Sequence, residues 1–162
     1  MAESMTVLIV GEGPVADVLH PMVTALGWSP MAATSLADAQ ARLDGAQAVV
    51  VTSHHEDVDG PAIRAALAAG TPYVGAMGSR RTQARRREWL LANGVTEAEL
   101  SALHAPVGLD IGADEPGEIA VSILAEIVAE RRGAGSAVAS ISDRDGAIHP
   151  DQPPGSAYCP SG

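Results

Sequence analysis

Half of the positive charge of this chain lies in one short stretch, which reads GAMGSRRTQARRRE over residues 75–88. Five of the ten basic residues fall there, in a chain whose formal net charge is −10. Arginine binds anions through charge-assisted hydrogen bonds, and a serine before a helix caps its first turn. The pattern therefore predicts an anionic ligand, held by Gly75, Gly78, Ser79, Arg80 and Arg81.

The remaining three arginines of the stretch are not all expected to bind the anion. Arg85 follows Arg81 by about one helical turn and can lie on the same face. Arg86 and Arg87 are predicted to point into solvent. The alternative interpretation is that the whole run is a solvated helix face, as runs of charge usually are.

A second glycine pattern, Gly11-Glu12-Gly13-Pro14-Val15-Ala16, fits the dinucleotide-binding fingerprint G-x-G-x-x-G/A. Gly11 would make the tight turn, Gly13 would let a phosphate approach the backbone, and Ala16 would keep helix and strand close. A merely tight turn is the alternative. NAD(P) is disfavoured, since residues 30–34 contain neither an acid for the ribose hydroxyls nor an arginine for a 2′-phosphate.

Two further loops carry polar residues. Ser53, His54 and His55 follow a predicted strand at the same edge of the sheet and are counted among the cofactor-binding residues. Their histidines can be a general base, metal ligands or ordinary loop polarity, of which the last is favoured. Adjacent histidines rarely bind one metal, so no metal site is predicted. Asp110 is expected to bind a ligand or brace the arginines, with a structural turn as the alternative. No catalytic group is predicted.

Strands alternate with helices along the chain, which indicates βαβ units. The fold class is therefore α/β, an open, doubly wound parallel sheet of the Rossmann type in three αβα layers. A strand order beginning 3-2-1-4 would make the first and fourth strands flank the ligand crevice. The predicted strands are 6–10, 29–33, 46–52 and 72–75, and the predicted helices are 14–26, 35–43, 61–69, 79–92, a short one near 96, and 116–132.

Composition excludes several classes of protein. Lysine is absent, which excludes the Walker phosphate loop and Schiff-base chemistry. An acidic chain argues against nucleic acid as a partner. No apolar run is long enough to cross a membrane and no signal peptide is legible, so a cytoplasmic location is expected. Residues 1–132 are predicted to form the domain, and residues 133–162, which include Cys159, a mostly unstructured Gly/Ser/Pro-rich tail.

The chain resembles the C-terminal Rossmann domain of the xanthine dehydrogenase accessory protein family (XdhC/CoxI type) over residues 6–133. The resemblance rests on VLIVGEGPVADVL, YVGAMGSRRTQARR and HAPVGLDIGADEPGEIAVSILAEIVAERRG. It implies a maturation factor for molybdenum hydroxylases, a chaperone rather than an enzyme. Such proteins bind the molybdenum cofactor, a phosphorylated pterin often extended to a dinucleotide, protect it during sulfuration by a cysteine desulfurase, and help insert it into the apo-enzyme.

Two departures from the family pattern bear on that expectation. Full-length members carry an N-terminal domain with a cysteine implicated in cofactor handling, and these 162 residues lack it. Either a separate chain supplies that domain, or this chain is a divergent member with another role. Residues 53–56 read SHHE where relatives often show a Thr-His-Asp-His-like run. The alternatives are a small NAD(P)-binding oxidoreductase and a partner-docking module without ligand, and a homo-oligomer is left open.

Overall fold

A computed structural model describes residues 3–148; residues 1–2 and 149–162, with Cys159 among them, lie outside the described part. The chain forms one parallel sheet of five strands in the order β2-β1-β3-β4-β5. Among the described residues, no helix is long and apolar enough to cross a membrane. The strands are β1 (Thr6–Val10), β2 (Ser29–Ala33), β3 (Ala48–Val51), β4 (Tyr73–Ala76) and β5 (Leu103–His104).

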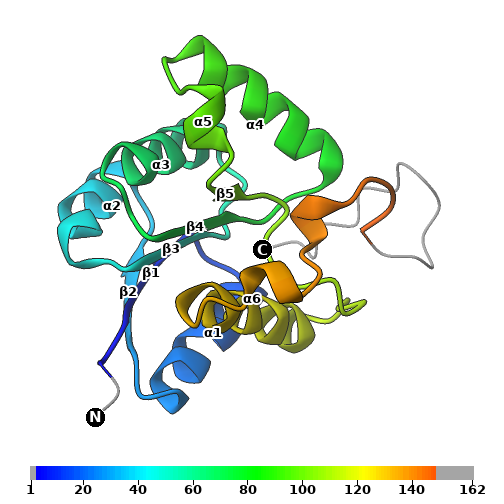
Figure 1. Cartoon of the computed structure of the whole chain (residues 1–162). Coiled ribbons are helices and arrows are strands. Elements are labelled where there is room, and N and C mark those ends of the chain that lie inside the picture. The colour runs from blue at the N-terminus through cyan, green and yellow to red at the C-terminus, as the bar shows by residue number, and fades with distance from the viewer. Residues whose placement is uncertain (1–2, 149–162) are drawn as a thin grey trace.

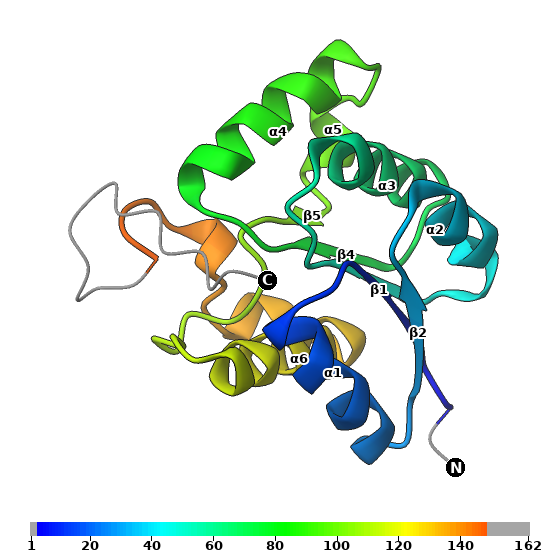
Figure 2. The same cartoon turned by 180° about the vertical axis from the view of Figure 1, so that it is seen from behind.

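Helices cover both faces of this sheet, which confirms the open three-layer α/β fold (Figures 1 and 2). α1 and α6 pack on one face, and α2, α3 and α4 lie on the other. The helices are α1 (Pro14–Ala25), α2 (Leu36–Arg42), α3 (Glu56–Ala68), α4 (Arg80–Ala92), α5 (Glu97–Leu100) and α6 (Pro116–Arg131).

The core lies on both sides of the sheet because its central strands are buried on both faces. Alternate residues of β3 serve the two sides: Ala48 and Val50 pack with α1 and α6, whereas Val49 and Val51 pack with α2 and α3. All four residues of β3 are fully buried. Burying one such valine stabilises the fold by roughly 1.5–3 kcal/mol.

The strand order differs from the predicted 3-2-1-4. β1 pairs with β2 on one side and with β3 on the other, so β3 separates β1 from β4. In this order the connections reverse direction between β1 and β3, and ligands of such sheets bind at the carboxyl ends of those two strands. The loop after β1 therefore faces the loop after β3 rather than the arginine stretch after β4.

Most elements lie within two residues of their predicted bounds, with larger differences at α3 and β5. α3 begins at Glu56, five residues before the predicted start, because three acids in its first turn stabilise the helix N-terminus. Pro61 lies inside this helix rather than at its start. The sequence also misses β5, which is only two residues long and therefore carries no recognisable strand pattern.

Residues 133–148 are packed against the domain, in contrast to the predicted unstructured tail. They contain two short 3₁₀ helices, 135–137 and 141–143, and Ser140 and Ile141 are buried. The backbone N–H of Ile141 donates to the Gly108 oxygen at 3.0 Å, and that of Asp110 donates to the Ala139 oxygen at 2.8 Å. These bonds tie the segment to the loop that precedes α6.

Candidate functional site

Gly11 turns the chain between β1 and α1 at the carboxyl edge of the sheet. Its φ is +126°, a conformation that residues with side chains rarely adopt. A Cβ there would lie 2.5 Å from the Ser53 nitrogen and 2.7 Å from the Thr52 Oγ1. The loop after β1 and the loop after β3 are therefore in direct contact, and only glycine fits between them.

Replacing Gly11 by Ala is expected to lower the free energy of unfolding by about 1–2 kcal/mol, because it adds backbone strain and a contact with backbone atoms of Ser53. Gly27→Ala is the matched control, since Gly27 also has a positive φ (78°) but nothing within 4 Å of its Cβ position. Urea denaturation of both variants measures the difference. Equal losses of unfolding free energy in the two variants would show that the backbone at Ser53 moves aside at little energetic cost.

The N-terminus of α1 carries no side-chain cap. Gly13, with φ of +112°, is its N-cap residue, and Pro14 follows it. The first N–H groups of a helix have no partners within the helix and carry partial positive charge, which suits an anion. Ala16 is buried in the core beside this turn, as the fingerprint requires. This end of α1 is the element best suited to a phosphate.

The polar residues after β3 lie opposite this turn. Ser53 is buried, and its Oγ accepts a hydrogen bond from the His55 N–H at 3.1 Å. His54 and His55 are exposed, and His55 precedes the first turn of α3. Within residues 3–148 no group of three His, Cys, Asp or Glu side chains is placed to hold a metal ion.

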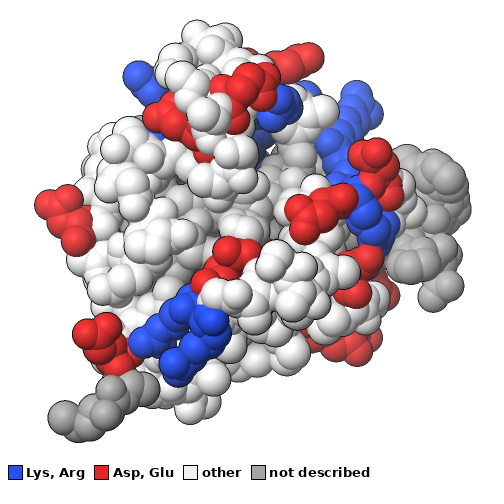
Figure 3. All heavy atoms as spheres, in the orientation of Figure 1, with Lys and Arg blue, Asp and Glu red and all other residues white. Residues whose placement is uncertain are grey.

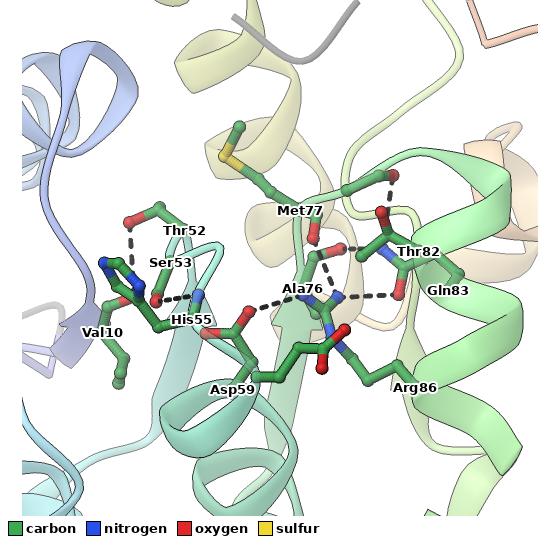
Figure 4. A network of polar contacts seen from close by, with 12 residues as sticks. Val10, Thr52, Ser53, His55, Asp59, Ala76, Met77, Thr82, Gln83 and Arg86 are labelled. Atoms are coloured by element: carbon green, nitrogen blue, oxygen red, sulfur yellow. Dashed lines mark hydrogen bonds and ion pairs between the residues drawn. The ribbon is translucent and has the colours of Figure 1, made fainter. Parts of the chain in front are cut away.

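Arg86 does not point into solvent as predicted. It is only 6% exposed, and its Nη2 lies 3.0 Å from the Asp59 Oδ2 on α3 (Figure 4). Its Nη1 donates to the Met77 oxygen and to the Gln83 Oε1, both at 2.9 Å. The expectation failed because the carboxylate that draws Arg86 inward is 27 residues away in the chain. Arg86 ties the turn after β4 to α3.

Asp59 lies between this network and the loop after β3. Burial raises the pKa of Asp59, against the lowering effects of Ser53, Arg86 and His54. Its Oδ1 is buried and makes no hydrogen bond of normal geometry with the described residues, although the Ser53 hydroxyl is near enough to favour the charged form. The carboxylate therefore depends for compensation on the nearby Ser53 hydroxyl and on Arg86, its ion-pair partner at 3.0 Å.

The glycines and serine of the arginine stretch have separate roles. Gly75 lies within β4, where a Cβ would be 2.5 Å from the Val107 Cγ2, so close packing accounts for it. Gly78 has φ of +140° and makes the turn into α4. The Ser79 Oγ accepts from the Thr82 N–H at 3.1 Å, which confirms the predicted cap.

The arginines of α4 meet different partners. Arg81 is exposed at the first turn. Arg85 pairs with Glu56 at 3.3 Å, and Arg87 pairs with Glu97; in both pairs the side chains are more than half exposed. Arg80 instead donates from Nη2 to the Ile141 oxygen at 3.0 Å and from Nε to the Gly146 oxygen at 3.2 Å. Arg80 and Arg81 are thus the two that lie at the carboxyl edge.

Asp110 braces an arginine, but not one from α4. Arg144 holds it with two hydrogen bonds, from Nε to Oδ2 at 2.5 Å and from Nη2 to Oδ1 at 3.0 Å. These bonds from Arg144 lower the pKa of Asp110. Burial and the nearby positive charge of Arg144 lower the pKa of Arg80. Figure 3 shows basic atoms bordered by acidic ones where α4 meets the segment after α6.

A buried carboxylate on α6 is a feature that sequence reasoning missed. Glu126 is 1% exposed and accepts hydrogen bonds from the Tyr73 hydroxyl at 2.6 Å, the Gly108 N–H at 3.1 Å and the Ser140 hydroxyl. Its Oε1 also lies 3.3 Å from the His104 Nδ1. The sequence does contain an indication of this carboxylate, because an acid stands inside the apolar run SILAEIVA, where an unpaired buried charge would be costly.

The Glu126 cluster lines a groove of about 400 Å³ beside the edge strand β5. The ring of His104 stacks on that of Tyr73, with 4.7 Å between centroids. Burial alone would lower the pKa of His104, but Glu126 raises it above its ordinary value. Burial alone would raise the pKa of Glu126, but hydrogen bonds from His104, Ser140 and Tyr73 lower it. Glu126 thus joins β4, β5, the loop before α6 and residue 140.

Comparison with known families shows to which family this domain belongs. A family model described as the XdhC Rossmann domain matches residues 7–127. The chain belongs to the XdhC family. Its matched part contains the turn at Gly11, the loop after β3, the arginine stretch and Asp110, so all the candidate positions lie within this XdhC domain.

Curated relatives match parts of this XdhC domain. The molybdenum cofactor insertion chaperone PaoD of Escherichia coli is 35% identical over 95 residues, which are 59% of this chain and 30% of PaoD. A probable xanthine dehydrogenase component from Bacillus subtilis is 39% identical over 85 residues, 52% of this chain and 24% of that protein. The chain therefore matches less than a third of the length of either relative.

A solved structure supports the fold of the XdhC domain. A chain described as a xanthine dehydrogenase from Bacillus halodurans superposes with a TM-score of 0.63 at 24% identity. The match covers 80% of this chain and 43% of that one. At this identity the likeness shows the shared α/β architecture.

Proposed function

We propose that this XdhC domain binds the molybdenum cofactor at the carboxyl edge of its sheet and serves as an accessory protein in the maturation of molybdenum hydroxylases. The carrying observation is the uncapped N-terminus of α1, reached through Gly11 and Gly13 at the contact between the loops after β1 and β3. Membership of the XdhC family and the likeness to a molybdenum cofactor insertion chaperone support the choice of ligand.

The residues present fit a phosphorylated ligand. Two glycines with positive φ leave the α1 backbone open to a phosphate, and Arg80 and Arg81 add positive charge at the first turn of α4. Ser53, His54 and His55 lie on the loop between these two helix ends and would line the bound ligand. The cofactor would bring molybdenum and its pterin dithiolene; the chain itself would bind, orient and shield it.

Partners follow from the same proposal. The domain would deliver the cofactor to a molybdenum hydroxylase apo-enzyme in the cytoplasm, with a cysteine desulfurase supplying sulfur. The chain matches less than a third of PaoD. We propose that a separate chain supplies the cysteine-bearing domain that the family resemblance implies. The role proposed is that of a chaperone rather than an enzyme.

Alanine at Arg80 and at Arg81 is expected to weaken cofactor binding by about 1–3 kcal/mol each, as loss of a charge-assisted hydrogen bond should. The measurement is anaerobic gel filtration with freshly released cofactor, reading pterin and molybdenum in the protein peak. The charge-matched control is the double variant Arg85→Ala/Arg87→Ala, which removes two exposed arginines of the same helix.

Wild type and the control variant should carry the cofactor, and Arg80→Ala/Arg81→Ala should not. Equal retention by the two double variants would remove the arginines from the site. Binding of NADH near micromolar affinity, with no retention of the pterin, would favour the oxidoreductase alternative instead.

A further inference from the structure

Residues 138–148, here called the strap, cross the carboxyl edge of the sheet beside the first turn of α4 (orange in Figures 1 and 2). The strap is attached at several points. Ser140 pairs with Leu109 in an antiparallel bridge, and Ile141 is buried. Arg144 closes the strap on the loop before α6 through its two hydrogen bonds to Asp110.

The strap occupies an arginine of the proposed anion site. Within residues 3–148, both hydrogen bonds of the Arg80 guanidinium go to main-chain oxygens of the strap, those of Ile141 and Gly146. Both acceptors are neutral carbonyls; the carboxylates of Asp145, in the strap, and of Asp110, which Arg144 holds, act on Arg80 through their charge without a hydrogen bond to it. An anionic oxygen makes a stronger, charge-assisted bond to a guanidinium than a neutral carbonyl does. Arg80 therefore has more to gain from a phosphoryl group than from the strap.

We propose that the strap is an internal competitor for Arg80, so that binding of a phosphoryl group at Arg80 releases residues 141–146, and loosening the strap strengthens that binding. This rests on the proposed function, since it takes Arg80 as a ligand-binding residue. The coupling is reciprocal. If closure of the strap lowers the affinity for the ligand by some factor, then bound ligand lowers the equilibrium constant for strap closure by the same factor. A partner protein that drew the strap away would thereby prepare the site for cofactor.

The test uses the full chain and inorganic pyrophosphate, titrated by calorimetry. Arg144→Gln removes the bonds that close the strap and leaves Arg80 in place. It is expected to bind pyrophosphate roughly fivefold or more tightly than wild type, although it has lost a positive charge nearby. The charge-matched control is Arg42→Gln, on an exposed residue in the last turn of α2, where affinity should not change.

Hydrogen exchange of the Ile141 amide reports the strap directly, because that N–H is bonded to the Gly108 oxygen when the strap is closed. Pyrophosphate should speed its exchange in wild type. Exchange of the β3 amides, which should stay slow, shows that Arg144→Gln is folded. Adding Arg80→Ala to Arg144→Gln should abolish the gain in affinity.

Three results would overturn the inference, and they separate it from the proposed function. Equal affinities in wild type and Arg144→Gln, with unchanged or slower Ile141 exchange, would refute competition while the anion site stands. A gain in Arg144→Gln that survives Arg80→Ala would place the anion elsewhere. Absence of pyrophosphate binding in wild type and Arg144→Gln alike would remove Arg80 from the ligand site and the competition with it.

Discussion

Replacing Arg86 by Met is expected to lower the free energy of unfolding by about 3–5 kcal/mol, because removal of one partner leaves a buried charge without compensation. The charge is that of Asp59, which is 3% exposed and accepts from the Arg86 Nη2 at 3.0 Å. The Met77 oxygen and the Gln83 Oε1 lose their donor as well. Urea denaturation at neutral pH measures the loss.

The neighbouring substitution Arg87→Met is the matched control. Arg87 is about half exposed and pairs with Glu97 at the surface, where such pairs contribute roughly 0–1 kcal/mol. Changing Arg86 and Asp59 together, to Met and Leu, should recover most of the stability, since an apolar pair replaces the ion pair. Equal losses in Arg86→Met and Arg87→Met would show that water reaches Asp59.

The dependence of this loss on pH identifies its cause. Burial already raises the folded pKa of Asp59 above its ordinary value of 3.8, so the folded state keeps this proton to higher pH than the unfolded state does. Stability from this group therefore falls as pH rises from that value through the folded pKa. Without Arg86 the pKa rises further, and the deficit of Arg86→Met should shrink in acid, where Asp59 is protonated.

Glu126→Gln is expected to cost about 2–3 kcal/mol at about pH 5.5, because hydrogen bonds to a charged acceptor are stronger than those to a neutral amide. The variant also loses the ion pair with His104, 3.3 Å away, and its NH₂ group cannot accept from Ser140. Glu130→Gln, the same change on an exposed residue one turn later, should stay within about 0.5 kcal/mol of wild type.

The cost of Glu126→Gln should be largest between pH 4.5 and 6.5, the ordinary pKa values of Glu and His. The raised pKa of His104 gives stability that is complete below 6.5 and is lost as pH rises through the folded value. The lowered pKa of Glu126 gives stability that is present above 4.5 and is lost as pH falls through its folded value. A cost independent of pH would show that His104 and Glu126 do not form an ion pair.

Local features of the fold were predictable from the sequence. The bounds of β1 and β2 follow from short apolar or turn-bounded runs, and the cap of Ser79 follows from a serine directly before a predicted helix. A cap depends on neighbours within one helical turn, so a sequence window contains its interacting atoms. The alternation of strands and helices then indicates the parallel sheet and its family.

Long-range features were not predictable in the same way. The burial of Arg86 depends on Asp59, and the groove beside β5 depends on Glu126 meeting His104 and Ser140. The positions of these residues in the sequence do not predict that they are in contact in the fold. The described part of the segment after α6 illustrates the same point, since its Gly- and Ser-rich sequence favours disorder, yet Ile141 and Arg144 attach it to the domain.

The sequence by itself determined that this chain is an α/β domain of the XdhC family with a glycine turn after β1 and an arginine-rich helix after β4. Only the tertiary structure decided which loops face each other. The strand order places β3 beside β1, and the Arg80 guanidinium donates its hydrogen bonds to the strap. The physical reason is that periodicity and capping act within a few residues, whereas strand order and buried ion pairs are chosen by the packing of the whole domain.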